Sequence, residues 1–157
     1  MTAVRARSLG WLAVLFAAGS APSGAQETTA VSRAPAQVAV VGNDYAFVRF
    51  PATIPAGATL FSFDNRGNVR HEMSVVLLHA GVTMQQIVEK GPGAASSRAF
   101  ADRPIGILIA RPGEASGGQL FVELLSGRRY LVVCSLKDAP DAPQHAQLGM
   151  VTSFDVP

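Results

Sequence analysis

Residues 130–150 have the sequence YLVVCSLKDAPDAPQHAQLGM, and this stretch determines how the rest of the chain is interpreted. It carries a thiol at Cys134, an imidazole at His145 and a thioether at Met150, with ten residues between the first two and four between the last two. Because Cys134 is the only cysteine in 157 residues, no intramolecular disulfide can form. Thiolate, thioether and imidazole together are a ligand set suited to copper. The stretch therefore predicts a copper site on a loop that follows a strand.

Each of these residues has a simpler interpretation when it is taken alone. A lone buried cysteine is usually a small apolar core residue, and a methionine before the last strand usually packs in the core. A histidine in a polar loop usually faces solvent. The spacing of the three, rather than any one of them, favours a metal site.

The first 25 residues have the pattern of a secretory signal peptide. Arg5 and Arg7 precede an apolar run over residues 9–18, and small residues follow up to Ala25, where we expect cleavage. The apolar run is shorter than the roughly 20 residues that span a bilayer, which disfavours a retained membrane anchor. We therefore expect a periplasmic or secreted protein with no stable membrane insertion after signal cleavage.

Export changes how the charge is interpreted. The whole chain carries a formal net charge of +2, from 13 Lys and Arg against 11 Asp and Glu. Without the two arginines of the signal, 11 basic residues balance 11 acidic ones. A neutral chain gives no indication of nucleic-acid binding, and any partner is expected to be recognised by shape and apolar contact.

The remaining chain divides into a tether over residues 26–37, which is polar and without periodicity, and one domain over residues 38–157. In the domain, short apolar or alternating runs are separated by clusters of Gly, Pro, Asn and Asp, as is typical of an all-β sandwich. Seven to eight strands are expected, at residues 37–41, 46–50, 58–65, 71–78, 105–110, 119–124, 129–134 and 149–155.

One segment of the domain has helical character. Residues 83–90 begin with Thr83 and have Gln86 three residues later, a capping-box pattern, and their apolar residues recur at helical spacing. We expect one short helix there. Residues 91–102 are small and polar with Gly and Pro, and this composition predicts a surface loop.

A fourth ligand has to come from the three histidines His71, His79 and His145. His71 and His79 stand at opposite ends of one expected strand, about 26 Å apart, and cannot share a metal. The strand that ends at Cys134 leads into a loop, and the strand that starts at His71 follows a loop. One end of the sandwich can therefore gather His71, Cys134, His145 and Met150. Two histidines and a cysteine with a weak axial methionine describe a blue-copper electron-transfer site, whereas zinc has little use for methionine.

These residues resemble the cupredoxins, in particular small exported plastocyanin-like and pseudoazurin-like domains. The resemblance rests on Asn65 and Gly67 ahead of His71, on Ser126, Gly127 and Tyr130 ahead of Cys134, and on the series Cys134, His145, Gly149 and Met150. It implies a Greek-key sandwich that binds one type 1 copper and passes single electrons. It also implies that His71, Cys134 and His145 are the equatorial ligands and that Met150 is the axial ligand.

The sequence departs from the family pattern in two places. Ten residues between Cys134 and His145 exceed the two to four of the smallest members and look more like the ligand loop of copper nitrite reductases. Glu72 stands where several members carry an asparagine that ties the two ligand loops together. Glu72 either faces solvent, as most carboxylates do, or performs a related task beside the metal.

Two functions remain open at this stage: a soluble carrier of single electrons, and a protein that holds copper for delivery or tolerance. Few further Met and His residues favour the carrier, and a copper-free binding sandwich would make the four donors accidental. An enzyme is not expected, because only His79 is spare for a second copper. An apolar patch around His145 and Leu148 is expected to contact a redox partner.

Overall fold

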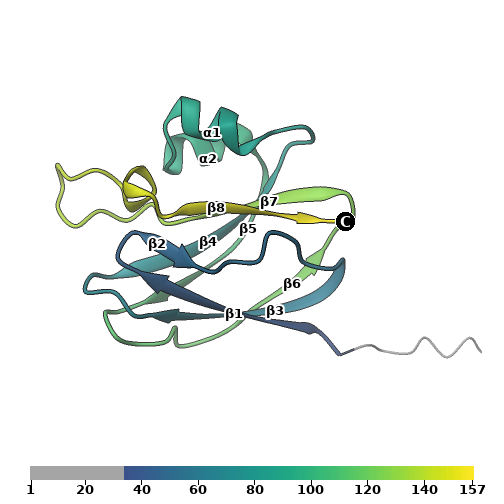
Figure 1. The fold of residues 1–157 in the computed structure, drawn as a ribbon, viewed down its shortest axis with the longest axis horizontal. Helices are drawn as coiled ribbons and strands as arrows, with labels where there is room; N and C mark the ends of the chain where they lie inside the picture. The colour runs from purple at the N-terminus through teal and green to yellow at the C-terminus, as the bar shows by residue number, and fades with distance from the viewer. Residues whose placement is uncertain (1–33) are drawn as a thin grey trace, which may run out of the picture. The chain divides into compact units, whose positions relative to one another are not determined.

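The two near-continuous apolar runs of the sequence form the centre of one sheet, in the computed structural model that describes residues 34–157 (Figure 1). The strand order of this sheet is β5-β4-β7-β8, and each neighbouring pair is antiparallel. Its strands are β4 (His71–Leu78), β5 (Ala101–Ala110), β7 (Arg128–Val133) and β8 (Val151–Val156).

The second sheet has the order β2-β1-β3-β6. In it β1 and β3 run parallel, whereas the other neighbours are antiparallel. Its strands are β1 (Ala36–Asn43), β2 (Ala46–Val48), β3 (Gly57–Asn65) and β6 (Leu120–Leu124). Eight strands in two sheets over the described part of the chain confirm the predicted all-β sandwich.

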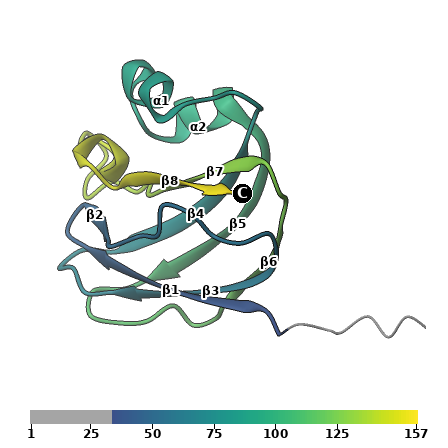
Figure 2. The same cartoon turned by 45° about the vertical axis from the view of Figure 1, so that its right-hand side comes forward.

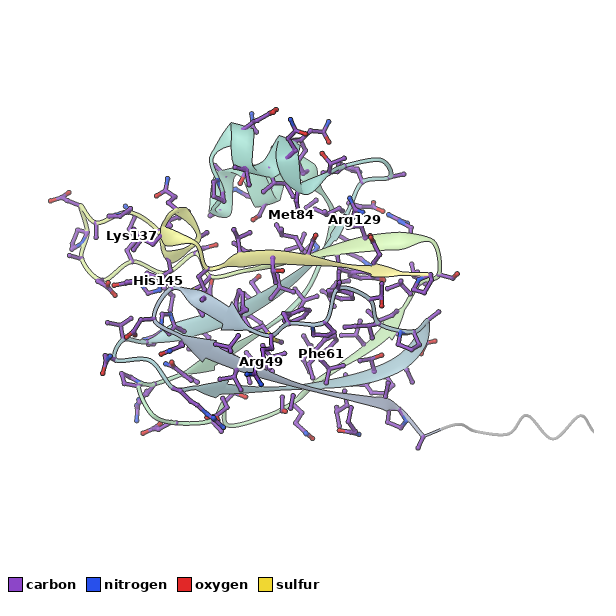
Figure 3. All side chains as sticks on the ribbon, viewed as in Figure 1. Arg49, Phe61, Met84, Arg129, Lys137 and His145 are labelled. Atoms are coloured by element: carbon purple, nitrogen blue, oxygen red, sulfur yellow. The ribbon has the colours of Figure 1, made fainter. Side chains whose placement is uncertain are left out.

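The main core lies between the two sheets. Phe61 of β3 lies there without exposure to solvent (Figure 3), and Tyr130 of β7 stacks on Phe154 of β8 with 5.1 Å between ring centroids. Burial of such large side chains is worth about 1.5–3 kcal/mol each and is the main force that holds the sheets together.

A second cluster explains why β4 and β7 are apolar on both faces. Two helices, α1 (Met84–Lys90) and α2 (Ala94–Phe100), lie over the sheet that contains these strands, on the side away from β1 and β3 (Figures 1 and 2). Ile87 of α1 packs with Val76 of β4 and Leu131 of β7. A strand covered on both faces carries a continuous apolar run instead of an alternating one.

The predicted helix is confirmed, since α1 begins after Thr83 and the reciprocal Thr83–Gln86 capping box is present. The surface loop predicted for residues 91–102 is wrong, because α2 forms there and β5 starts at Ala101. Gly93 precedes α2 with a φ of 144°, and the backbone N–H of Ala94 donates to Gln144 Oε1 at 2.8 Å. A partner 50 residues away therefore caps this helix.

Strand ends differ from the prediction by a few residues. β2 ends at Val48 rather than residue 50, because Arg49 has a φ of 51° and leaves the extended conformation. β5 starts four residues earlier than expected and pairs with β4 across two register shifts. β1 includes the last two residues of the expected tether. The signal segment, over residues 1–25, lies outside the described residues.

Within residues 34–157, no helix is long and apolar enough to cross a membrane.

Candidate metal centre

Four predicted donors lie at the ends of neighbouring elements. His71 is the first residue of β4, Cys134 follows the last residue of β7, His145 begins the short 3-10 helix η1 (His145–Leu148), and Met150 precedes β8. All four are at most 1% exposed. The label of His145 in Figure 3 marks this end of the sandwich. The pairing of β4 with β7 and of β7 with β8 places these residues side by side.

Three of these donors converge on one point. The distances are 3.1 Å between His71 Nδ1 and His145 Nδ1, 3.3 Å between Cys134 Sγ and His145 Nδ1, and 4.0 Å between Cys134 Sγ and His71 Nδ1. A metal held about 2.0 Å from imidazole nitrogen and about 2.3 Å from sulfur separates its ligands by about 3.3–3.7 Å. Small side-chain shifts would therefore let the three atoms hold one ion, and their ligation of copper stays a prediction.

The ligand loop, residues 135–144, folds so that His145 returns to Cys134. His145 N–H donates to the carbonyl of Leu136 at 2.8 Å, and Ala146 N–H donates to the carbonyl of Cys134 at 2.8 Å. Met150 is tied on both sides, since its N–H donates to the His145 carbonyl at 3.0 Å and its carbonyl accepts from Cys134 N–H at 3.1 Å. Backbone hydrogen bonds thus fix the spacing of the three donors despite the long loop.

The buried Asn65 organises the turn that leads to His71. Its side-chain amide donates to the carbonyls of Val69 at 2.8 Å and Ala110 at 3.2 Å, and its Oδ1 accepts from Gly67 N–H at 2.9 Å. A Cβ atom on Gly67 would lie 3.0 Å from His71 Nε2, so only glycine lets this turn pack against the imidazole. The asparagine and glycine ahead of His71 therefore shape the turn.

Glu72 does not face solvent, so the interpretation of it as an ordinary solvated carboxylate is wrong. It is 8% exposed, and its Oε1 accepts a hydrogen bond from Ser135 N–H at 2.8 Å. Its own backbone N–H lies 3.4 Å from Cys134 Sγ and donates to it. Glu72 therefore joins the strand that carries His71 to the strand that carries Cys134.

Met150 is buried in the main core between the sheets. Its methyl group packs near Gly42, where an added Cβ would lie 3.1 Å from Met150 Cε. These contacts fit a packing role, and the proposed axial role of the thioether stays a prediction.

Two residues beside the site, Asp138 and Tyr45, were not predicted from the sequence. Asp138 Oδ1 lies 2.9 Å from His145 Nε2, and Asp138 Oδ2 accepts a hydrogen bond of 2.5 Å from the Tyr45 hydroxyl. Tyr45 also places a ring edge against both imidazoles, with centroids 5.1 Å from His145 and 6.1 Å from His71. Asp138 belongs to the quoted loop, but the β1–β2 turn that supplies Tyr45 carries no sequence signal that links it to the site.

Burial and hydrogen bonds shift the pKa values of these groups. Burial raises the pKa of the Cys134 thiol to about 11. Burial, and then the neighbouring His145, lower the pKa of His71. The hydrogen bond from Tyr45, more than the one from His145, lowers the pKa of Asp138. Without a metal, the Cys134 thiol therefore keeps its proton at pH 7, and a cation can enter in exchange for that proton.

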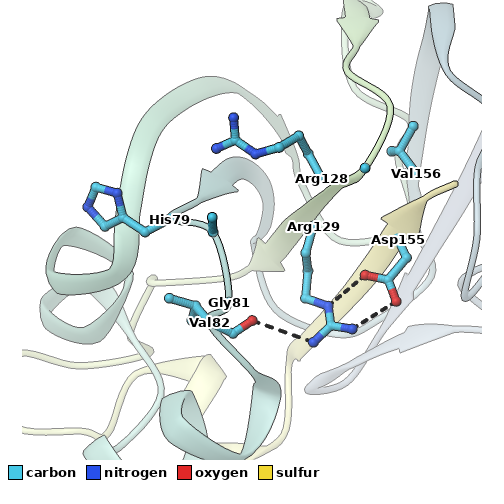
Figure 4. A pocket seen from close by; sticks show the side chains of 9 residues that line it. His79, Gly81, Val82, Arg128, Arg129, Asp155 and Val156 are labelled. Atoms are coloured by element: carbon cyan, nitrogen blue, oxygen red, sulfur yellow. Dashed lines mark hydrogen bonds and ion pairs between the residues drawn. The ribbon is translucent and has the colours of Figure 1, made fainter.

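His79 lies at the other end of β4, as predicted, and lines a pocket of about 380 Å³ with Arg128, Arg129 and Asp155 (Figure 4). Arg129 pairs with Asp155 through two hydrogen bonds of 2.6 and 2.8 Å. Residues 34–157 contain one cluster of His, Cys, Asp or Glu side chains with metal-binding spacing. It consists of His71, Cys134 and His145.

Solved structures of auracyanins resemble this chain. Auracyanin from the photosynthetic bacterium Roseiflexus castenholzii, reduced with dithionite, aligns with a TM-score of 0.53 and 16% identity over 80% of this chain and 99% of that chain. Auracyanin B aligns with a TM-score of 0.53 and 19% identity over 81% and 93% of the two chains. Auracyanin A from Chloroflexus aurantiacus, described as a "blue" copper protein, aligns with a TM-score of 0.53 and 20% identity over 79% of this chain and 100% of that chain.

Comparison by sequence alone finds no relative. No family model matches the chain, and a search of curated proteins gives no match either. Identities of 16–20% with the auracyanins bear on the fold alone, which the TM-scores of 0.53 support. The chain therefore has the cupredoxin fold, that of the blue-copper proteins.

Proposed function

We propose that this chain is an exported type 1 copper protein that transfers single electrons between redox partners. One observation carries the proposal: Cys134 Sγ and the Nδ1 atoms of His71 and His145 converge, fully buried, at one end of a cupredoxin fold. Bound copper would supply a one-electron change between Cu(I) and Cu(II). The likeness to the auracyanins, one of which is described as a "blue" copper protein, supports this choice of metal.

The protein's part in this function is to keep one geometry for both oxidation states. His71 and Cys134 extend from strands at the centre of a sheet, and the backbone of His145 is tied to the Cys134 strand. Such ligands move little when the charge of the ion changes, which lowers the rearrangement that each electron transfer requires. Met150 is proposed as the weak axial ligand.

The burial of the donors favours the carrier over the alternative, a copper-handling protein. A protein that accepts the metal ion has to reach the residues that hold the ion in this chain. An electron, by contrast, can cross a short layer of protein without such access. With His71, Cys134 and His145 at most 1% exposed, transfer of an electron is the easier process. No enzymatic role is proposed, because the only histidine outside the centre, His79, lies at the opposite end of β4.

Contact with a redox partner is proposed at the end of the sandwich where the ligand loop lies. Leu148 is 45% exposed two residues before Met150, and Ala139, Pro140 and Pro143 of the loop are exposed as well. Because His145 itself is 1% exposed, an electron would cross the residues that cover it rather than a bare ring edge. Periplasmic or extracellular location is part of the proposal and rests on residues 1–25.

A visible spectrum of the purified mature protein with Cu(II) tests the proposal. We expect an intense thiolate-to-copper absorption, which Cys134→Ser abolishes and the remote control His79→Ala leaves unchanged. Addition of one electron per protein should bleach the band, and removal of that electron should restore it. A colourless protein that binds only Cu(I) would instead support copper handling, and a protein that binds neither ion would refute both.

A further inference from the structure

The outer nitrogen of His145 is not free. Its Nε2 atom lies 2.9 Å from Asp138 Oδ1, although the ring as a whole is 1% exposed. By contrast, Nε2 of His71 has no hydrogen-bond partner among residues 34–157, and a carboxylate oxygen of Asp44 lies 4.0 Å away. The two histidines of the centre are therefore held differently, and only His145 has a carboxylate as a direct partner.

The contacts of His145 assign the proton on its ring. A carboxylate oxygen can only accept, so Nε2 must carry the hydrogen in the bond to Asp138. In the neutral ring Nδ1 then keeps its lone pair, and it faces Nδ1 of His71 at 3.1 Å and Sγ of Cys134 at 3.3 Å. The S–H group of Cys134 is able to donate to that lone pair.

Asp138 is itself fixed by Tyr45, whose hydroxyl donates to its second carboxylate oxygen. Tyr45 lies in the two-residue turn between β1 and β2 with a φ of 58°, a conformation that costs a residue other than glycine about 1 kcal/mol or more. That turn sends the Tyr45 ring across the site, where its edge contacts both imidazoles. Residues from β1–β2 and from the ligand loop thus meet at His145.

We propose that Asp138, held in place by Tyr45, is a positioning residue that keeps the ring proton of His145 on Nε2 and presents Nδ1 to the metal. The inference rests on the proposed metal site. Asp138 prevents rotation of the His145 imidazole and favours the ring form whose lone pair is on Nδ1, the atom that faces the metal. Carboxylates beside ligating histidines have the same effect in other metal sites. It also closes the site toward solvent with a polar pair, Tyr45 and Asp138, in place of an exposed imidazole edge.

The proposal is tested first without any metal, by NMR of the reduced apoprotein with ¹⁵N-labelled histidine. The wild type should show His145 in one neutral form with the proton on Nε2. Asp138→Ala should give a mixture of the two neutral forms, whereas Asp138→Asn should keep most of the first, because its carbonyl can still accept from Nε2–H. Asp141→Asn is the matched control, on an exposed residue of the same loop.

The second measurement is the affinity for Zn²⁺, a redox-silent probe, by competition with a coloured chelator. We expect Asp138→Ala to weaken zinc binding about 10–100-fold, as loss of such partners does elsewhere. Tyr45→Phe, which keeps the ring but removes the donor to Asp138, should weaken it less. Asp141→Asn should bind zinc like the wild type.

The outcomes separate this inference from the proposed function. A proton on Nδ1 of His145 in the wild type overturns the positioning role, as does Asp138→Ala with unchanged ring proton and unchanged zinc affinity. If the NMR and zinc results come out as expected but Cu(II) gives no thiolate absorption, the positioning role stands and the blue-copper function fails. A change of ring proton would not follow if Asp138 served packing alone.

Discussion

The backbone N–H of Glu72 points at the sulfur of Cys134, with 3.4 Å between N and Sγ, while the Glu72 carboxylate accepts from the residue after that cysteine, Ser135. One residue thus makes two bonds across the boundary between β4 and β7. Both bonds hold Cys134 at a fixed distance from His71, the neighbour of Glu72 in sequence.

Removal of the Glu72 carboxylate should destabilise the apoprotein. Glu72→Ala leaves Ser135 N–H without its charged partner, and we expect a loss of about 1–3 kcal/mol in the free energy of unfolding. Glu72→Gln retains an acceptor and should lose less. Urea unfolding measures the difference, with Glu123→Ala on the exposed face of β6 as the control. Equal losses for Glu72→Ala and the control would contradict the bracing role.

Much of this centre was predictable because its donors are rare. With one cysteine and three histidines in the chain, the spacing of Cys134, His145 and Met150 leaves few alternatives. The strand boundaries followed from apolar runs and turn residues, and β4 was predicted with the same bounds that it has in the structure. These features are local, so the sequence shows them directly.

The features that the sequence did not show depend on partners far apart along the chain. Helix α2 has no side-chain cap of its own, and Gln144 supplies the acceptor at its start. Glu72 looks like any surface carboxylate until Ser135, 63 residues later, is seen to donate to it. Tyr45 approaches His145 through a turn with a positive φ, which neither composition nor periodicity predicts.

An alanine at Gly67 should disturb the centre through His71. Its Cβ would lie 2.6 Å from Asp44 Oδ1 and 3.0 Å from His71 Nε2, so the turn or the imidazole has to shift. We expect Gly67→Ala to cost about 1–3 kcal/mol in the free energy of unfolding and to weaken zinc binding. Gly117→Ala is a matched control, since a Cβ there meets nothing within 4 Å. Similar zinc affinities for the two variants would show that the turn adapts.

The Cys134 thiol of the reduced apoprotein should react slowly. Burial leaves it 0% exposed and raises its pKa to about 11, against about 8.5 for a free cysteine. At pH 8 we expect alkylation by iodoacetamide to be at least about a hundredfold slower than in the urea-unfolded chain. Mass spectrometry over time gives both rates. Comparable rates would mean that the site opens readily without metal.

The pair Arg129–Asp155 should make a small contribution to stability that depends on pH. The hydrogen bond from Arg129 lowers the pKa of Asp155 below its ordinary 3.8, so below about pH 5 the unfolded chain takes up a proton that the folded chain does not. The contribution is therefore present at neutral pH and is lost as the pH falls through the lowered pKa. Because the Asp155 side chain is 50% exposed, we expect at most about 1 kcal/mol.

Urea unfolding of the wild type and Asp155→Asn between neutral pH and about pH 2.5 measures this contribution. The difference between the two proteins should be constant near neutrality and vanish in acid. Other carboxylates with lowered pKa values, such as Asp102, affect both proteins equally and cancel in the difference. A difference that grows in acid would contradict the assignment.

Leu148 provides a test of where a partner binds. It is 45% exposed beside the ligand loop, and in electron self-exchange two copies of the protein would meet through this surface. Leu148→Lys places like charges on both approaching faces, so we expect exchange at low salt to slow about tenfold or more, with partial recovery in salt. NMR line broadening in mixtures of the oxidised and reduced copper protein gives the rate. Val88→Lys, on a 57% exposed residue of α1, adds the same charge elsewhere and should have little effect. If both variants slow exchange equally, net charge alone is responsible, and the electron enters by another face.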